Sequence, residues 1–522
     1  MEHCRRIVAH LAVLLLAGGL YFIQGPQFVR FPSTHLADGG DSILNAWILA
    51  WNAHALFDPQ LQVWDAPIFY PARNTFTFSE TMFGNLWITL PLQYWTGNPV
   101  LAFNALVFMA FVLGMYFTFL LVRQWTGSYL AGLISGFLFS FNPLRWAEVC
   151  HVQLLPFFWA PLGLLFCHHF LETHRIKWFL YLGFVVVAQF YTSIYLGIIL
   201  FMTLVVFSAA HVFGEISGPE RRMGLKNYRL WVRLIACSGL CFLALVPLGI
   251  PYLQSVQDWN FVRSESENAS FSCELVSFLV PDACFKNYQS WQQFFQGRIR
   301  GYYGVGLVPA TLAVTGWILM RRTRGFFTSA QVRIFRRITW TALAMIVCML
   351  GPYLIVGDHK TDIPLPYLLV YYVVPGAKAM RVPARYVFPL LLCLAIMAGF
   401  AVAYLVAVVK RRPPAWQLIW SFLGLLLLAL DYSVADNPGI SLPVKDRFPP
   451  VYEYLAQSNS GQPVLELPVH WQQQFRYLHF QTGHWRPLVG GESGSYPPAI
   501  LEMTKRLQGP PTEATLQFLS LI

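Results

Sequence analysis

The chain has 522 residues, of which 56% are hydrophobic and only 12% are charged, and its mean hydropathy is +0.49. Soluble domains carry about 25% charged residues, so this composition excludes an ordinary soluble enzyme. A net charge of +11 would indicate nucleic-acid binding in a soluble protein; here the charges lie in loops between apolar runs, and no nucleic-acid partner is expected. We therefore predict a polytopic α-helical membrane protein.

The sequence contains about 11 apolar segments, and several of them reach the length of a membrane helix, about 17–25 residues. The segments 128–141 and 178–190 are shorter, and we expect those helices to be partly sunk in the protein. The first apolar segment follows Arg5 and Arg6 and lacks a small-residue cleavage site, so we expect an uncleaved span instead of a signal peptide. The predicted spans are residues 7–24, 99–122, 128–141, 154–171, 178–190, 193–212, 231–253, 302–320, 338–356, 384–409 and 416–432.

The segment 81–95 is also apolar, but it contains Asn85 and Pro91, and we predict an interfacial or re-entrant piece on the outer side. With this topology, Lys and Arg residues are more numerous on the predicted inner loops than on the outer loops, as the positive-inside rule requires. The N-terminus is then cytoplasmic and the C-terminus extracytoplasmic, which fits an integral protein of a bacterial inner membrane.

The stretch HLADGGDSILNAWILAW begins soon after the first span, inside an acidic outer loop over 25–98. At about 100° per residue, Asp41, Asn45 and Asn52 share one helical face. Trp47 and Trp51 share another, with Leu44 and Ala55. This pattern predicts a helix in the membrane–water interface, with tryptophans at headgroup depth and a polar edge turned towards an active site.

Asp38 and Asp41 are the candidate catalytic acids. An active-site carboxylate at this position takes a proton from an acceptor hydroxyl, or binds a divalent cation such as Mg²⁺ or Mn²⁺. The alternative is that Asp41 is a helix N-cap, held ionised by backbone N–H groups. In that case Asp38 is the better base, and the sequence leaves open which acid is primary.

Arg381 and Arg385 in RVPAR directly precede a predicted span, and Pro383 favours an extended turn between them. Guanidinium groups bind phosphate bidentately, so we predict that this pair holds the phosphate of a donor. The alternative is snorkelling to ordinary anionic lipid.

In NPLRWAEVCHVQ, Arg145, Glu148 and His151 recur at spacings of three, which places them on one helical face. We expect Arg145 to bind phosphate and His151 to bind a substrate hydroxyl; a local ion-pair network is the alternative. Glu80 is predicted to bind substrate as a second carboxylate beside Asp41, or else to be a charge at a helix start. His54 is a further substrate-binding candidate, although its apolar neighbours also fit a structural histidine.

After the last span, residues 432–522 have the composition of a small extracytoplasmic α/β domain, separate from the multi-span part over 1–431. VYEYLAQS predicts a helix and PVLELPV a strand, while RYLHFQTG and RPLVGGESG predict extended pieces. Cys273 and Cys284 lie in one outer loop and are candidates for a disulfide, with Cys150 as an alternative partner.

Together these features resemble the GT-C membrane glycosyltransferases, a group with protein O-mannosyltransferases, aminoarabinose lipid A transferases and oligosaccharyltransferases. The chain is more closely similar to bacterial RgtA/B/C/D-like and YfhO-like groups. The residues that carry the resemblance are GDSILNAWILAW with HAL, PIFYP followed by FSE, RWAEVCHVQLL, RVPAR and VLELP.

The resemblance implies a sugar transfer from a polyprenyl-phosphate-linked donor at the outer membrane face. Asp41, with Asp38 nearby, then acts on the acceptor or on a metal, and arginines hold the donor phosphate. The Asp38-Gly-Gly-Asp41 spacing departs from the family's paired acids, and the chain stops soon after LQFLSLI, as in a shortened or inactive relative. The competing hypotheses are a flippase or transporter of a lipid-linked saccharide, for which the break near Gln189 and Ser193 is the best sign, and a non-catalytic assembly partner.

Overall fold

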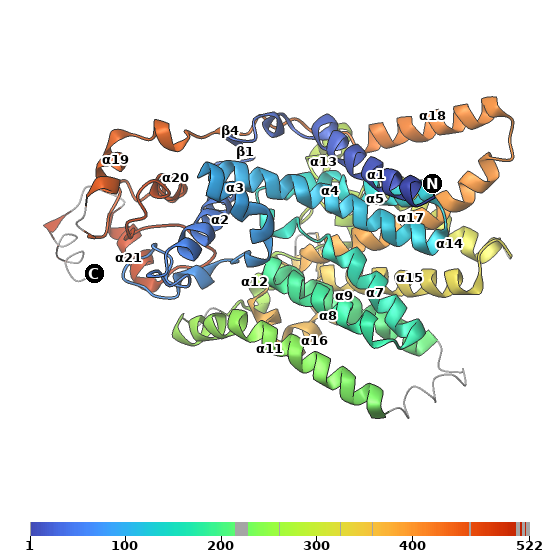
Figure 1. Ribbon diagram of the computed structural model, residues 1–522, viewed down its shortest axis with the longest axis horizontal. Coiled ribbons are helices and arrows are strands. Elements are labelled where there is room, and N and C mark those ends of the chain that lie inside the picture. The colour runs from blue at the N-terminus through green and yellow to red at the C-terminus, as the bar shows by residue number, and fades with distance from the viewer. Residues whose placement is uncertain are drawn as a thin grey trace.

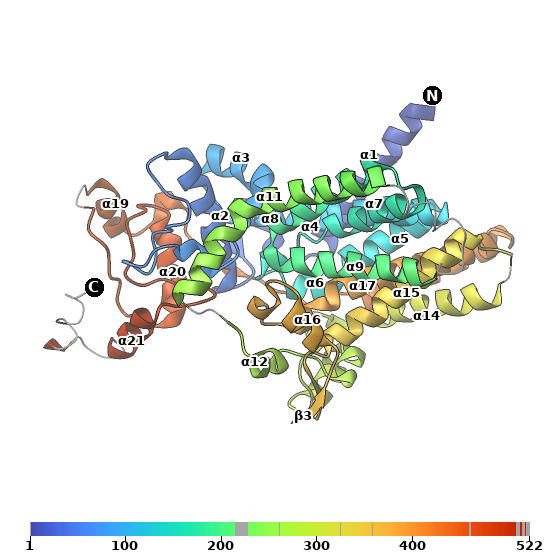
Figure 2. The same cartoon turned by 90° about the horizontal axis from the view of Figure 1, so that it is seen from below.

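The computed structural model describes residues 2–214, 228–259, 262–323, 325–357, 359–458 and 461–507, with positions 512, 513 and 517. Its long helices lie side by side in one bundle, and α2, α3, α19, α20 and α21 gather beyond one end of that bundle (Figure 1). The view turned by 90° shows the same separation (Figure 2). The arginine-bearing stretch with Arg221, Arg222 and Lys226, predicted as an inner loop, lies outside the described residues.

Every predicted span overlaps a helix. These helices are α1 (Glu2–Gln24), α4 (Pro99–Thr126), α5 (Tyr129–Ser140), α7 (Trp159–Thr173), α8 (Ile176–Thr192), α9 (Ile194–Gly214), α11 (Tyr228–Trp259), α14 (Leu307–Arg322), α15 (Ser329–Met349), α17 (Val387–Val409) and α18 (Pro414–Asp431). Among the described residues, seven helices are long and apolar enough to cross a membrane. The chain is therefore a polytopic helical membrane protein, and the total of about 11 spans stays a prediction.

The shorter elements connect and cap this bundle. The α-helices are α2 (Asp41–Phe57), α3 (Leu86–Thr96), α6 (Pro143–Ala147), α12 (Glu265–Ser270), α13 (Gln289–Phe295), α16 (Tyr367–Val373), α19 (Pro450–Gln457), α20 (Trp471–Gln481) and α21 (Pro498–Arg506). The 3-10 helices are η1 (Gln27–Arg30), η2 (Thr75–Phe78), η3 (Phe83–Asn85), η4 (Val152–Leu154), η5 (Leu275–Leu279), η6 (Lys286–Tyr288), η7 (Ala377–Ala379), η8 (Pro383–Tyr386) and η9 (Lys445–Arg447). Two short antiparallel pairs complete the fold: β1 (His35–Leu36) with β4 (Ile440–Ser441), and β2 (Tyr353–Val356) with β3 (His359–Pro364).

The predicted bounds are least accurate at α15, which begins at Ser329 instead of residue 338. Thr328 and Gln331 form a reciprocal capping box there, and this cap starts the helix before its apolar stretch begins. α3 has 11 residues, which span about 16 Å. It is too short to cross a bilayer, in agreement with the prediction that 81–95 is not a span.

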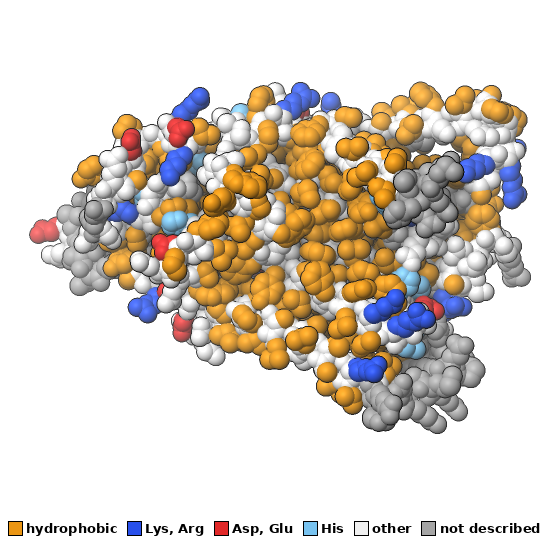
Figure 3. Space-filling view, viewed as in Figure 1, with side chains coloured by type: hydrophobic (Ala, Val, Ile, Leu, Met, Phe, Trp, Pro, Cys, Tyr) orange, Lys and Arg blue, Asp and Glu red, His pale blue; other side chains and the backbone are white. Residues whose placement is uncertain are grey.

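The surface of the bundle is apolar. Hydrophobic side chains cover its middle, whereas Lys and Arg gather towards one end and both charge signs occur at the end with the C-terminal segment (Figure 3). In the most apolar windows of α11 and α18, only 11% and 6% of the residues are buried inside the protein. Faces of this kind are stable in contact with lipid.

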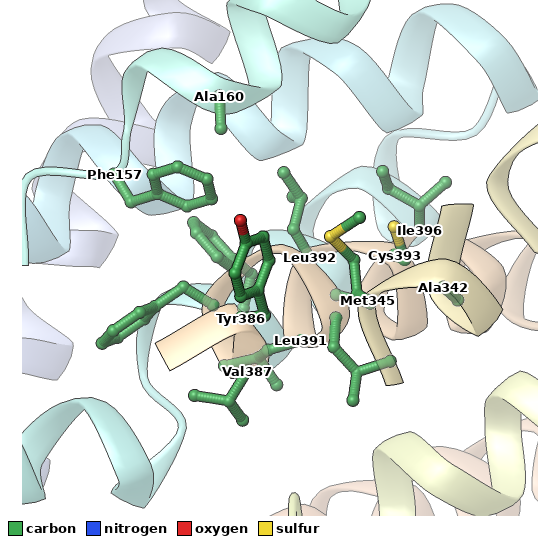
Figure 4. Packing of buried hydrophobic residues seen from close by; sticks show 14 of the residues in the cluster. Phe157, Ala160, Ala342, Met345, Tyr386, Val387, Leu391, Leu392, Cys393 and Ile396 are labelled. Atoms are coloured by element: carbon green, nitrogen blue, oxygen red, sulfur yellow. The ribbon is translucent and has the colours of Figure 1, made fainter. Parts of the chain in front are cut away.

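Two hydrophobic cores hold the molecule together. The first lies between α5, α7, α9, α15 and α17. Figure 4 shows Phe157 and Tyr386 in this core, beside Met345, Leu391 and Leu392. Since Tyr386 directly follows Arg385, this packing fixes where the RVPAR segment enters α17.

The second core joins parts of the chain that are far apart in sequence: α1, α2, the first outer loop, the start of α4, and residues 442–507. Trp47 and Trp51 of α2 are each only 2% exposed. Their indole N–H groups donate to Gln481 Oε1 at 2.9 Å and to the Val63 carbonyl at 2.8 Å. The prediction that these tryptophans lie at lipid-headgroup depth is wrong, because the C-terminal segment and the loop itself cover them.

The C-terminal segment is mostly helical. α19 confirms the helix predicted at VYEYLAQS, but the extended piece predicted at RYLHFQTG is wrong, because α20 covers Trp471–Gln481. Phe475, Leu478 and His479 have helical spacing and are buried. The strand predicted at PVLELPV is reduced to a single bridge between Val464 and Leu488. The described part of this segment shares the second core and has no sheet of its own; its one strand pairs with the first loop.

The cysteines Cys150, Cys273 and Cys284 are all free in the structure, so the candidate disulfide between Cys273 and Cys284 is not formed.

Gln481 connects three segments from the middle of the second core, where it is fully buried. Its amide N–H groups donate to the Pro67 carbonyl at 2.5 Å and to the Arg486 carbonyl at 2.9 Å. Its carbonyl oxygen accepts the Trp47 indole N–H at 2.9 Å. One side chain thus links α2, the first outer loop and the C-terminal segment.

We expect Gln481→Leu to lower the free energy of unfolding by about 2–4 kcal/mol, because it leaves buried donors and acceptors unpaired. Thermal unfolding of the detergent-solubilised protein measures this change. Gln457→Leu is the matched control, since Gln457 is exposed and its side chain bonds to Glu453 one turn earlier in α19. Equal stability of the two variants would contradict the proposed linking role of Gln481.

Candidate functional site

The start of α2 separates the two acids of the first loop. Asp38 Oδ1 accepts the backbone N–H of Ser42 at 3.0 Å, so Asp38 caps the helix. Asp41 is the first residue of α2 and its carboxylate is free for other contacts. The alternative that Asp41 is the N-cap is therefore wrong, and Asp38 is the acid committed to the backbone.

His151 lies between two carboxylates. Its Nε2 is 3.1 Å from Asp41 Oδ2, and its Nδ1 is 2.8 Å from Glu148 Oε2. The three side chains are 45%, 32% and 28% exposed for Asp41, His151 and Glu148. We refer to Asp41, His151 and Glu148 as the acid–imidazole array; it contains two residues from NPLRWAEVCHVQ and one from the first loop.

The predicted polar edge of α2 positions this array. Asn45 is buried and donates to the Cys150 carbonyl at 3.0 Å, next to His151. Asn52 lies on the same face, about two turns further along α2, and donates to the Thr81 carbonyl at 2.7 Å. These bonds from buried amide N–H groups fix the rotation of the helix, because any other rotation leaves the donors unpaired. Asp41 consequently points at His151.

The array carries a protonated imidazole at neutral pH. Burial alone would lower the pKa of His151, but hydrogen bonds to Asp41, Cys150 and Glu148 outweigh burial and raise it. The hydrogen bond from His151 lowers the pKa of Asp41, and the charges of His151, Arg385 and Arg381 lower it further. For Glu148, burial opposes ionisation, but the bond from His151 dominates and the pKa is lowered. Both acids are therefore ionised, and the array has a net negative charge.

Arg381 and Arg385 lie near this array, close enough for their charges to act on Asp41. The Arg385 guanidinium carbon is 4.9 Å from the centre of the Tyr195 ring, and that of Arg381 is 4.9 Å from the Phe271 ring. The Tyr195 hydroxyl donates to the Val382 carbonyl at 2.5 Å and accepts the Val382 N–H at 3.0 Å. The RVPAR backbone is thus attached to the first turn of α9.

A third guanidinium, not singled out from the sequence, belongs to the same cluster. Burial lowers the pKa of Arg381, and the positive charges of Arg263 and Arg385 lower it further. Arg263 binds Glu267 at 3.2 Å and the Gly494 carbonyl at 2.9 Å. Only the spacing of four residues to Glu267 marked it in the sequence, and that spacing is common on helix surfaces.

Glu80 has a different partner from the one predicted. Its carboxylate oxygens accept the N–H groups of Ile194 at 2.8 Å and Tyr195 at 3.0 Å, so it caps the N-terminus of α9. Burial raises its pKa, while those backbone bonds and the Arg385 charge act in the opposite direction. The sequence suggested a charge at the start of the helix directly after Glu80, but the helix that Glu80 caps is α9, more than a hundred residues later. Glu80 positions Tyr195, and through it the arginine segment.

Arg145 points into the protein. It is fully buried, donates to the Leu155 and Ala110 carbonyls at 2.8 and 3.3 Å, and stacks on Phe111 and Phe139. Burial lowers its pKa to about 9. The prediction that Arg145 binds a donor phosphate does not fit this position, and its predicted pairing with Glu148 is replaced by the contact of Glu148 with His151. The spacing of three residues predicted that Arg145 and Glu148 share one helical face. α6 ends before Glu148, so the two side chains do not share that face.

His54 is at the opposite end of α2 from Asp41 and does not join the array. Its imidazole stacks on Trp485, with ring centroids 4.5 Å apart and an interplanar angle of 7°. Burial lowers the pKa of His54, so the imidazole is neutral at pH 7.

Glu492 is an acid near the array that the sequence did not indicate. It is 6% exposed in the GGESG loop of the C-terminal segment. Burial raises its pKa to about 7, and the negative charge of Asp41 contributes to this rise. The backbone beside it is held by bonds from Phe69 N–H to the Gly490 carbonyl and from Tyr70 N–H to the Leu488 carbonyl. A carboxyl in a polar loop gives no burial signal in a sequence, which is why it was missed.

The two acids predicted as metal ligands do not fit a divalent cation. Asp38 is committed to the Ser42 N–H and Asp41 to His151. Within the part of the chain that the structure describes, no group of three or more His, Cys, Asp or Glu side chains has the arrangement of a metal site. No chemical step below therefore involves Mg²⁺ or Mn²⁺.

The fold and this site define a polytopic helical membrane protein with an acid–imidazole array beside a cluster of arginines. The chain belongs to the family described as "Domain of unknown function (DUF6311)", whose profile matches residues 69–433. A comparison with curated protein sequences finds no match.

Among solved structures, the chain is similar to two crystal structures of ArnT from Cupriavidus metallidurans, one bound to undecaprenyl phosphate and one in the apo state. The first has a TM-score of 0.45 and 15% identity and covers 98% of this chain and 72% of that chain. The second has a TM-score of 0.42 and 14% identity and covers 100% and 73%.

The raised pKa of Glu492 predicts how the free energy of unfolding changes with pH. Its folded pKa of about 7 lies above the usual unfolded value of about 4.3, so it favours folding at low pH and this contribution is lost as the pH rises through 7. We expect the wild-type protein to lose up to about 3 kcal/mol of stability from this group between pH 5 and 8. Glu492→Gln removes that slope and is more stable than wild type at pH 8.

Thermal unfolding at both pH values measures the difference, with Glu502→Gln as control because the Glu502 side chain is 46% exposed and pairs with Arg506 within the same helix. The same pH slope in wild type and Glu492→Gln would contradict the assignment.

Proposed function

We propose that the protein is a membrane glycosyltransferase that moves a sugar from a polyprenyl-phosphate-linked donor to an acceptor hydroxyl at the extracytoplasmic face. The observation that carries this proposal is the position of the acid–imidazole array close to Arg381 and Arg385, at one end of an apolar helical bundle. The sequence resemblance to GT-C enzymes supports the same reaction. The proposed setting is a bacterial inner membrane, with the N-terminus in the cytoplasm, because positive charges concentrate on the predicted inner loops.

The arginines are suited to the leaving group. Arg381 is exposed and Arg385 half-buried, and each stacks on an aromatic ring that limits its rotamers. Guanidinium groups held in this way bind a phosphate bidentately with little loss of side-chain entropy. Both flank Pro383, just before α17 begins at Val387. A lipid phosphate at this level leaves its prenyl chain against the apolar helices.

The array is suited to the acceptor. In the proposed reaction the acceptor oxygen bonds to the anomeric carbon of the sugar, and the bond from that carbon to the phosphate oxygen breaks, with its electron pair left on the phosphate. The acceptor proton passes to the Asp41 carboxylate, which is ionised and 45% exposed. His151 and Glu148 orient Asp41 and keep it charged, while the arginines stabilise the charge that develops on the phosphate.

The break near Gln189 and Ser193, which the sequence analysis gave as the best sign of a transporter, lies between the end of α8 and the start of α9. Ser193 separates α8 from α9, and the N-terminus of α9 is capped by Glu80 from the first outer loop. Gln189 is fully buried and donates to the Pro156 carbonyl at 3.3 Å. The start of α9 at this break is capped by a side chain of the protein itself, so the break supports chemistry at the surface better than a substrate path through the bundle.

We expect Asp41→Asn to reduce sugar transfer by about 10²–10⁴-fold, because the amide cannot take the acceptor proton. Asp38→Asn is the matched control: it carries the same change three residues earlier, and Asn caps a helix as well as Asp does. The measurement is transfer of labelled sugar from a panel of undecaprenyl-phosphate hexoses in membranes. Wild-type rates in Asp41→Asn would instead support a non-catalytic assembly partner.

We expect Arg385→Gln and Arg381→Gln each to weaken undecaprenyl-phosphate binding by roughly tenfold or more, since each removes charge-assisted hydrogen bonds. Arg298→Gln is the control, because Arg298 is an exposed arginine that also stacks on a phenylalanine, at 4.7 Å from Phe294. Titration of the purified protein, followed by native mass spectrometry, measures the affinity. Equal losses in all three variants would show non-specific attraction to anionic lipid.

A further inference from the structure

A pocket of about 320 Å³ lies at the far end of α2 from Asp41, between the first outer loop and the C-terminal segment. Its volume is within the range of small-ligand sites, about 300–1,000 Å³. Four aromatic or heteroaromatic rings, a carboxylate and a guanidinium are among the groups that line it: Trp51, His54, Tyr70, Trp485, Asp65 and Arg73.

The rings form a stacked wall. His54 and Trp485 are parallel at 4.5 Å between centroids, and the Trp51 ring is tilted by 51° against Trp485 at 5.7 Å. Trp485 is half-buried and Tyr70 is 38% exposed at the pocket. Large aromatic rings that keep an accessible surface in a polar, charged region are binding surfaces more often than packing elements.

The wall is held in place before any ligand arrives. Trp485 has a left-handed backbone with φ of 53°, which is rare for a bulky side chain. Its N–H donates to the carbonyl of Gln481 at 2.8 Å, and the Gln481 side chain bonds to the carbonyls of Arg486 and of Pro67, which lines the pocket. The Trp51 indole is fixed by the Val63 carbonyl. A strained residue that several hydrogen bonds hold in position is typical of a ligand site.

We propose that this pocket binds a pyranose unit of a saccharide acceptor. A pyranose ring has an apolar C–H face, which suits the stacked wall, and a rim of hydroxyl groups. Arg73 is exposed and donates to such hydroxyls, and Asp65 accepts from them; one Asp65 oxygen also accepts the Asn74 N–H at 2.8 Å. A wall of rings with few polar groups at its edge is the general composition of small-ligand pockets.

The position of the pocket indicates which part of the acceptor it holds. Asp41 and His54 are separated along α2 by a helix length of about 20 Å. The bound unit is therefore remote from the reacting hydroxyl, and the acceptor is a glycan of several units or a glycolipid. This inference rests on the proposed transferase function. Binding energy from a remote unit holds the reacting hydroxyl in place at the array.

Saturation-transfer NMR on the full-length protein tests the pocket directly. The probes are methyl β-D-glucopyranoside, methyl α-D-mannopyranoside and N-acetyl-D-glucosamine, with the protein in lipid nanodiscs so that no sugar-headed detergent competes. Sorbitol is the probe control, because it has the hydroxyl groups without a ring face. We expect saturation transfer to the ring protons of at least one pyranose and none to sorbitol. The absence of transfer to every pyranose overturns the proposal.

Trp485→Ala is expected to weaken that binding roughly tenfold, through loss of the ring contact. Trp471→Ala is the matched control, because Trp471 is 58% exposed on α20 of the same segment and does not line the pocket. If Trp485→Ala fails to unfold cooperatively, Arg73→Gln at its exposed position replaces it, and it must lower the affinity. Unchanged binding in the pocket variants overturns the proposal.

Arg381→Gln separates this inference from the proposed function. It is expected to lose donor binding while its saturation transfer stays at the wild-type level. Sugar binding without any transferase activity leaves the pocket standing and removes the proposed function. Transferase activity whose acceptor KM is the same in wild type and Trp485→Ala removes the pocket as an acceptor site and leaves the proposed function standing.

Discussion

The contact of His151 with two carboxylates is the interaction on which the rest of the site depends. An imidazolium between Asp41 and Glu148 keeps both acids charged where burial alone would favour their neutral forms. The same contact joins the first outer loop to the segment after α6. Asn45 repeats that connection through the backbone of Cys150, so the direction of Asp41 is set by two independent hydrogen bonds. Without these two hydrogen bonds, the start of α2 would still be capped by Asp38, but Asp41 would not be directed at His151.

Each of the two hydrophobic cores holds a different part of this site in position. The larger helices of the bundle pack in one core, which fixes α17 and thereby the RVPAR segment before it. The other core brings the first loop under the C-terminal segment, which covers Trp47 and Trp51 and places Glu492 near Asp41. The candidate site lies where the two cores meet, so its acids depend on one and its arginines on the other.

The apolar lengths in the sequence were sufficient to predict the bundle, because a membrane helix is recognised from its own residues. Asp41, His151, Arg381 and Arg385 were also identified from local patterns, although their roles remain predictions. Long-range packing was not accessible in this way. The cover over Trp47 and Trp51 comes from residues more than four hundred positions away, and Arg145 turned inward because α6 ends after one turn. Which of the two acids caps α2 was left open by the sequence; Asp38 does so because a two-residue glycine spacer lets it reach the Ser42 N–H.

The cap that Glu80 places on α9 also has a consequence for distances within the site. From the first loop, Glu80 holds the backbone of Ile194 and Tyr195, and the Tyr195 hydroxyl holds Val382 on both its N–H and its carbonyl. The loop that bears the acids and the segment that bears the arginines are therefore connected by short polar links at the end of the bundle. A thinner or thicker bilayer that tilts the apolar helices leaves these links intact. The spacing between the acid-bearing loop and the arginine-bearing segment is in this way set by contacts within the protein and not by the thickness of the membrane.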